Sequence, residues 1–140
     1  MRWIFLILVF VVACLRAEER YAYKDGGGKY MSGHVFIVSE WLAIEGKDQE
    51  LWERAKQVLT LTRENEPGCI RAHVTRQLVH PASPGKSPYT IVLLQEYTDM
   101  DAFEAHVKSA YVVNFFETCV QDKATAIVKD WTCRLFSEGE

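Results

Sequence analysis

Two stretches of this 140-residue chain decide its fold: ENEPGCIRAHVTRQLVH (Glu64–His80) and YTIVLLQEYTDMDAFEAH (Tyr89–His106). Pro67 and Gly68 are typical of the end of a helix, because proline cannot continue a helix and glycine is favoured just beyond one. The residues that follow predict a strand, a turn and a second strand that leads directly into another helix. A strand pair in this position between two helices restricts the chain to a few folds.

The segment before these stretches predicts a strand and a helix. Residues His34–Ile44 are rich in β-branched and aromatic side chains, which favour a strand. In Gln49–Glu66 the apolar residues recur every three or four positions, as in a helix with one buried face, and Asp48 is a suitable N-cap. The apolar face of this helix consists of Leu51, Ala55, Val58, Leu59 and Thr62.

Two strands are predicted between the helices. Residues 70–79 alternate between apolar and polar, which indicates a strand with one covered side. Residues 81–88 contain three prolines and a glycine and predict a loop. Residues 89–97 are more uniformly apolar, so we expect this strand to lie in the centre of the sheet.

The rest of the chain predicts a broken helix and a last strand. Thr98 or Asp99 is expected to cap the helix, and the dipeptide Ser109-Ala110 to interrupt it. A second helical stretch covers residues 111–125, and residues 127–136 alternate as a strand does. The side chains that the first part of this helix turns inward are Met100, Phe103 and Val107.

The order strand, helix, strand, strand, broken helix, strand predicts one α+β domain over residues 34–137. It is the split βαβ arrangement of ferredoxin-like folds, in which helices cover one face of an antiparallel sheet. With 49% hydrophobic residues, the chain can bury a core of ordinary size. Both sides of the first strand are partly apolar, for example Phe36 on one and Ile37 on the other, so we expect a second subunit on the open sheet face. The predicted assembly is a homodimer.

The N-terminus predicts export. Arg2 precedes an unbroken apolar run over residues 3–15, which has the layout of a secretory signal peptide within residues 1–17. The run is shorter than the roughly 20 residues that a membrane-spanning helix needs. Residues 18–33 are polar and glycine-containing, and they predict a flexible linker.

Two processing routes and one cytoplasmic alternative remain open for this leader. Val11-Val12-Ala13-Cys14 resembles a lipoprotein box, which would make Cys14 the lipidated residue and the only membrane anchor. Cleavage after Ala17 would instead release a soluble, secreted or periplasmic chain. If translation starts at Met31, the protein has no leader and is cytoplasmic.

Charge and cysteine content exclude several classes of function. The net charge is −3 and both signs are mixed along the chain, so no basic face argues for nucleic acid. Beyond Cys14, the cysteines are Cys69, Cys119 and Cys133, without CxxC spacing or a disulfide framework. They are expected to be buried thiols, and Cys119 with Cys133 is the pair that would close if one does.

With this order established, the pattern EPGCIR, a hairpin and then LLQEYTDMDAFEAHVKSAYVVNF resembles the antibiotic biosynthesis monooxygenase domain. Within that group the chain is most similar to small quinol monooxygenases and autoinducer-2 phosphate isomerases. The resemblance covers Val35–Phe136. It implies a dimeric α+β barrel, a pocket between sheet and helices, and a chemistry that needs no metal, flavin or haem in most members.

The chain departs from its relatives at two places. Where many relatives begin a Glu-Glu-aromatic run, it has Gln95, followed by Glu96 and Tyr97. Where relatives often carry a histidine at the helix break, it has Ala110-Tyr111. The haem-degrading branch uses an Asn, a Trp and a His, and the last two positions fall at Tyr97 and near Phe115-Phe116, so haem cleavage is not expected.

His106 is the candidate catalytic base, because it matches the helix histidine of the family. A neutral imidazole can accept a proton near neutral pH, and the family chemistry begins by removing a proton next to a carbonyl or from a phenol. The alternative is a surface histidine beside Glu104 and Lys108. The resulting anion needs donors or cations, for which the candidates are Arg71, Arg76, Tyr97 and Tyr111.

Other side chains could contact a substrate or serve structure alone. Trp41 could line the pocket with Phe103, Phe115 and Phe116, or all four could belong to the core. Glu96 could pair with Glu40 as acid and base, or each could face solvent or pair with an arginine. A metal site at His73 and His80 is not expected, since no ligand lies at a suitable spacing. The candidate substrate-contacting residues are Trp41, Arg71, Arg76, Glu96, Tyr97, Phe103, Tyr111 and Phe115.

Three functions therefore compete for the same domain. The first is a cofactor-independent monooxygenase that acts on a quinol, phenol or similar enolisable small molecule. The second is a keto–enol isomerase of a small sugar-like compound, which needs a cationic site such as Arg71 with Arg76. The third is a protein that binds a small hydrophobic ligand without turning it over, because such a fold can hold pockets without catalysis.

Overall fold

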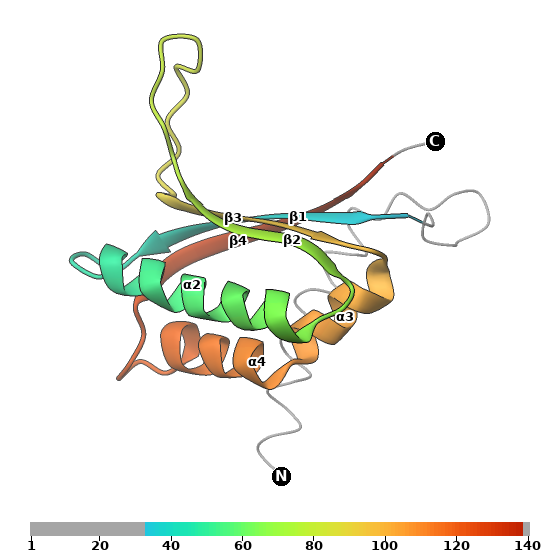
Figure 1. Ribbon diagram of the computed structural model, residues 1–140. Helices are drawn as coiled ribbons and strands as arrows, with labels where there is room; N and C mark the ends of the chain where they lie inside the picture. The colour runs from blue at the N-terminus through green and yellow to red at the C-terminus, as the bar shows by residue number, and fades with distance from the viewer. Residues whose placement is uncertain (1–32, 139–140) are drawn as a thin grey trace, which may run out of the picture. The chain divides into compact units, whose positions relative to one another are not determined.

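A computed structural model describes residues 33–138, which form a four-stranded antiparallel sheet covered on one face by helices (Figure 1). The strand order is β2-β3-β1-β4, so β3 and β1 are central, as predicted for β3. The ferredoxin-like α+β fold is confirmed. The strands are β1 (Val35–Ala43), β2 (Cys69–Arg76), β3 (Ile91–Tyr97) and β4 (Val128–Ser137), and the helices are α2 (Asp48–Asn65), α3 (Met100–Lys108) and α4 (Ala110–Phe116).

The two faces of the sheet differ, and β1 shows how. Its burial alternates from Val35 to Ala43, with every odd residue buried under the helices and every even residue half-buried. This alternation follows from the two-residue period of a strand. The even residues, such as Phe36, lie on the face that carries no helix, which we call the open face.

Helix α2 begins at Asp48, one residue earlier than predicted. Asp48 is the first helical residue rather than the N-cap, a position that Lys47 takes without a side-chain hydrogen bond. The Asp48 carboxylate instead accepts a hydrogen bond from Thr90 (2.7 Å) and pairs with Arg76 (3.5 Å). The prediction of Asp48 as the cap is wrong because the side chain serves tertiary contacts at the far end of the sheet.

The end of α2 is fixed by close packing against α3. Glu66 is the C-cap, and its backbone N–H donates to the Thr62 carbonyl (3.0 Å). Gly68 does not have a positive φ, so it is not needed here for a left-handed turn. A Cβ atom on Gly68 would lie 2.5 Å from the Cβ of Ala102 in α3, closer than two carbons can pack. Glycine is therefore required because the two segments touch.

The second helical region is broken where predicted. The Asp99 side chain accepts a hydrogen bond from the Ala102 N–H (2.8 Å) and caps α3. Ser109 is extended (ψ 144°), and its N–H and Oγ both donate to the His106 carbonyl (3.0 and 2.7 Å). α4 passes into a short π-helix, Glu117–Gln121, so the helical region ends before the predicted Thr125.

The core between sheet and helices has two parts. The larger contains Trp41, which is 4% exposed, stacks on Trp131 (5.3 Å between ring centroids) and contacts Phe115 (5.5 Å). The smaller contains Val35, Ile37, Tyr97 and Phe103. Cys119 and Cys133 are not joined by a disulfide, so the pair that could have closed stays open; Cys119 is buried and Cys133 is half-buried.

β2 ends earlier than predicted, at Arg76, and the chain leaves the sheet there. Residues 77–90, which we call the hairpin arm, project from the sheet on the side away from the helices before β3 begins (Figure 1). The leader, Cys14, Met31 and nearly all of the predicted linker lie outside the described residues. Within residues 33–138 no helix is long and apolar enough to cross a membrane.

Candidate functional site

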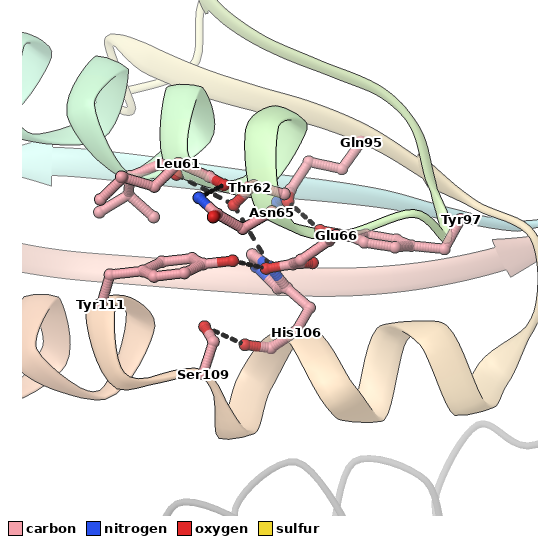
Figure 2. A network of polar contacts seen from close by, with 10 residues as sticks. Leu61, Thr62, Asn65, Glu66, Gln95, Tyr97, His106, Ser109 and Tyr111 are labelled. Carbon is pink, nitrogen blue, oxygen red and sulfur yellow. Dashed lines mark hydrogen bonds and ion pairs between the residues drawn. The ribbon is translucent and has the colours of Figure 1, made fainter.

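His106 is buried and paired with a carboxylate. Its side chain lies in the last turn of α3 and is paired through Nδ1 with Glu66, at 3.0 Å from Oε1 and 3.1 Å from Oε2 (Figure 2). The residue is only 6% exposed, so the alternative of a surface histidine is wrong. Glu104 and Lys108 pair with each other instead.

The pairing assigns the roles of the two imidazole nitrogens. An ionised carboxylate only accepts hydrogen bonds, so Nδ1 must carry a hydrogen and donate it in the hydrogen bond to Glu66. In the neutral imidazole, Nε2 then holds the lone pair, and it makes no hydrogen bond within residues 33–138. The carboxylate also stabilises the imidazolium that would form if Nε2 took up a proton.

Helix α2 supplies two residues to the site from one face. Thr62 and Glu66 are four positions apart, so they project from the same side of the last turn. Thr62 is fully buried; its Oγ1 donates to the Val58 carbonyl (3.0 Å) and lies 3.5 Å from His106 Nδ1. The contact between Gly68 and Ala102 holds the end of α2 against α3, which brings residues 40 positions apart into hydrogen-bonding distance.

Tyr111 reaches the same carboxylate from beyond the helix break. Its hydroxyl donates to Glu66 Oε1, so Glu66 joins the end of α2 to both α3 and α4 (Figure 2). Burial, followed by the hydrogen bond to Glu66 and its negative charge, raises the pKa of Tyr111 to about 12. The phenol is therefore a neutral donor throughout the physiological range.

Tyr97 forms an apolar wall beside the histidine. It is fully buried, and its ring lies 5.2 Å from the His106 ring and 6.0 Å from Phe103. Its hydroxyl donates to Gln95 Oε1 (2.7 Å), and burial, with the Glu66 charge next, raises its pKa well above the usual range. Gln95 is the neutral side chain that stands where many relatives carry a glutamate, and here it holds this phenol.

The two candidate arginines lie away from His106. Arg71 is on the open face, where its Nε is 3.3 Å from Glu96 Oε2. Arg76 is at the opposite end of β2, with its guanidinium 4.5 Å from the centre of the Trp52 ring and 3.5 Å from Asp48. The structure therefore does not place Arg71 and Arg76 in one cationic site, and it places neither of them beside His106.

The two candidate carboxylates on the open face are paired with cations. Glu96 contacts His34 (2.8 Å) as well as Arg71, and Glu40 accepts from Arg134 (3.0 Å). Of the three alternatives for these residues, the structure shows pairing with arginine. The remaining aromatic candidates divide between the two parts of the core: Trp41 and Phe115 in the larger, Phe103 with Tyr97 in the smaller.

Sequence reasoning missed Glu66 and Thr62. Thr62 had been counted as part of the apolar face of a helix, and Glu66 as its last residue. The available signal was the spacing of four between two polar side chains directly before Pro67. Within residues 33–138 no cluster of three or more His, Cys, Asp and Glu side chains could hold a metal ion.

A separate hollow of about 180 Å³ lies between α2 and β2. It is open to solvent at the edge of the sheet and does not include His106 or Glu66. Its lining residues are Trp52, Lys56, Thr60, Arg63, Ala72, His73 and Val74.

Comparison with known proteins gives the family. The sequence profile of the antibiotic biosynthesis monooxygenase (ABM) family matches residues 33–118, more than half of the 140-residue chain. The chain belongs to this family. A comparison with curated proteins found no match.

Solved structures share the fold at low sequence identity. A Caulobacter crescentus protein described as a "putative antibiotic biosynthesis monooxygenase" has a TM-score of 0.62 and 17% identity, covering 89% of this chain and 99% of that one. A Bacteroides thetaiotaomicron protein described as a "possible oxidoreductase" has a TM-score of 0.61 and 12% identity, over 77% and 100%. A Bacteroides fragilis protein described as dimeric with a ferredoxin-like fold has a TM-score of 0.59 and 12% identity, over 78% and 100%.

Proposed function

We propose that the protein is a cofactor-independent monooxygenase in which His106 removes a proton from a phenolic or otherwise enolisable small molecule. The observation that carries this proposal is the hydrogen bond between Glu66 and His106 Nδ1, which leaves Nε2 as the base. Membership of the ABM family supports an oxygenase in general terms. The substrate and the step are our inference.

For an enolisable substrate the proposed reaction has two parts. His106 Nε2 takes the proton from the carbon next to the carbonyl, and the substrate becomes an enolate. The enolate then gives electrons to dioxygen, and a C–O bond forms; with one proton the product is a hydroperoxide. Cleavage of its O–O bond with loss of water leaves a new carbonyl, so the carbon is oxidised and dioxygen is reduced.

Four side chains would serve the base in this scheme. Glu66 keeps the imidazole in one orientation and stabilises its protonated form. Tyr111, as a neutral donor on the same carboxylate, holds Glu66 in place. The Thr62 hydroxyl lies 3.5 Å from His106 Nδ1 and limits movement of the imidazole. Tyr97 excludes water from one side of the imidazole ring, which strengthens the electrostatic interactions at the site.

The other two functions have less support. An isomerase of a phosphorylated or similarly anionic compound needs a cationic site, and Arg71 and Arg76 lie elsewhere. A protein that only binds ligands does not require an oriented histidine. Burying a histidine and a carboxylate together has a desolvation cost, which is more easily explained by a use for the pair.

The test is oxygen uptake with a menadiol-type quinol and with an anthrone. The wild-type protein should consume oxygen, and His106→Ala should lower kcat by about 100-fold or more, the size expected for loss of a general base. His34→Ala is the matched control, because it removes a histidine that also pairs with a glutamate but lies on the open face. Equal activity of His106→Ala and wild type would exclude His106 as the base.

We also propose that the protein is a homodimer that associates through the open face. Leu94 and Phe136 on this face are 41% and 49% exposed, which is unusual for large apolar side chains on a central sheet. One structure with the same fold is described as dimeric. Light scattering at micromolar concentration should give twice the mass of one chain, and a monomer would exclude the proposal.

A further inference from the structure

The hairpin arm (residues 77–90) is a structured projection rather than a loose loop. The Gln77 side chain makes two hydrogen bonds across the base of the arm. Its Nε2 donates to the Ser87 carbonyl (3.1 Å), and its Oε1 accepts from the Ser87 N–H (2.7 Å). Nearer the tip, the Ser83 N–H donates to the His80 carbonyl (2.8 Å), and the Ala82 N–H donates to His80 Nδ1 (3.1 Å). These bonds hold the two sides of the arm together where it leaves the sheet.

This ordered arm exposes its apolar residues to water. Leu78 is 85% exposed and Val79 is 69% exposed, the largest values among the large hydrophobic side chains of the described residues. They lie two and three positions beyond the end of β2, at the base of the projection. Adjacent exposed apolar side chains on an ordered element are typical of a contact surface.

The arm rises on the same side of the sheet as the open face (Figure 1). That face carries both charge signs in balance, since Glu40 pairs with Arg134 and Glu96 with Arg71. A second copy of the face could therefore approach without a net repulsion between like charges. The arm would then stand beside the second copy.

The open face alone is a small surface for a stable interface. With strands about 4.8 Å apart and about 3.3 Å per residue, four strands of 7 to 10 residues present roughly 500 Å². A stable interface buries about 800 Å² per partner. A second contact surface on the same side of the molecule would enlarge the interface, and the arm is the element that projects there (Figure 1).

We propose that the hairpin arm clasps a second copy of this chain, with Leu78 and Val79 buried against the edge of the facing sheet. Packed sheets lie about 10 Å apart. Two or three extended residues beyond Arg76 span about 7 to 10 Å, which places these two side chains level with that edge. A two-fold axis makes the contact reciprocal, so each arm holds the other subunit. The clasp rests on the homodimer proposed above.

The test compares two variants with the same change in charge. The double variant L78D/V79D adds two negative charges at the apolar pair, and K86D changes the charge equally at an exposed polar residue of the same arm. Mass is measured by light scattering over a concentration series, and circular dichroism checks the fold. Wild type and K86D should be dimers with similar dissociation constants, and L78D/V79D should dissociate at concentrations at least 100-fold higher.

Each other outcome is decisive. If L78D/V79D and K86D dimerise as tightly as wild type, the clasp is wrong while the homodimer stands. If the wild-type chain is a monomer, both the homodimer and the clasp are wrong, and the apolar pair has no copy to hold. Oxygen uptake, measured on the same samples, tests the proposed catalytic role of His106 independently of the results on dimerisation.

Discussion

Residues 33–138 contain two histidine–glutamate pairs, one on each face of the sheet, and the surroundings of the two pairs differ more than their contact distances do. Glu66 and His106 lie 3.0 Å apart under the helices, with side chains 13% and 7% exposed. Glu96 and His34 lie 2.8 Å apart on the open face, where the glutamate is 12% exposed, the histidine is 48% exposed and Arg71 shares the carboxylate. The Glu96 charge is already balanced by a permanent cation, whereas the carboxylate of Glu66 contacts His106 and the Tyr111 hydroxyl. The comparison teaches that burial of the histidine and the absence of a competing arginine, rather than contact distance or burial of the carboxylate, decide which pair can orient a base.

The largest expected difference between the pairs is in activity. Glu66→Gln should lower kcat for oxygen uptake by roughly 100-fold, because an amide neither fixes the Nδ1–H tautomer nor stabilises the imidazolium. Glu96→Gln should leave kcat within about twofold of wild type, because Glu96 does not contact His106. Similar losses in both variants would contradict the distinction between the pairs.

The second expected difference is in stability. Glu66→Ala should lower the free energy of unfolding by about 2–3 kcal/mol, because His106 and Tyr111 lose a shared acceptor that water cannot easily replace. In the monomer, Glu96→Ala should cost less than about 1 kcal/mol, since His34 and Arg71 are 48% and 70% exposed there and can be hydrated instead. Urea unfolding of the two variants at pH 7 measures both values. If the two variants lost the same free energy of unfolding within error, the two pairs would be energetically equivalent and the prediction would be wrong.

The fold of this chain can be predicted from its sequence, because the signals for each element come from residues close together in the chain. Alternation in β1, the Asp99 cap and the break at Ser109 each depend on residues within a few positions of one another. These patterns set the order of the elements, and few folds accommodate that order. What the patterns did not give was the extent of β2 and of the helix after Tyr111, since strand and helix ends depend on packing.

The candidate site was only partly predictable, because its main contact joins residues 40 positions apart. His106 came from a family resemblance, and no local spacing pointed from it to Glu66. The prediction that Arg71 and Arg76 form one cationic site could have been rejected, because residues five apart on a strand lie on opposite faces. The register agrees, with Arg71 opposite Glu96 and Arg76 opposite Ile91.

The third expected difference concerns high pH. The folded pKa of Tyr111 is raised to about 12, so the phenol stays protonated in the folded state after it ionises in the unfolded state near pH 10. Its stabilising contribution is thus complete below pH 10 and is lost between pH 10 and about 12. The gap in unfolding free energy between wild type and Tyr111→Phe should therefore shrink across this window. Tyr89→Phe, whose hydroxyl bonds to Asp130 in the exposed part of the molecule, should give a smaller change over the same range. A gap between wild type and Tyr111→Phe that stays constant from pH 9 to 12 would show that Glu66 does not hold this phenol.

The smallest expected effect is on the reactivity of Cys69, which lies three residues beyond Glu66. Burial raises the pKa of this thiol, the negative charge of Glu66 raises it further, and Arg63 opposes both. Glu66→Gln removes the second cause, so alkylation of Cys69 by iodoacetamide at pH 8 should become about two- to threefold faster, while Glu96→Gln leaves the rate unchanged. Mass spectrometry of the Cys69 peptide from the native protein measures the rate. Cys119, which is 3% exposed, should remain slow in every variant and so report an intact fold. An unchanged Cys69 rate in Glu66→Gln would mean that the charge of Glu66 does not act on this thiol, and the electrostatic difference between the two pairs would fail.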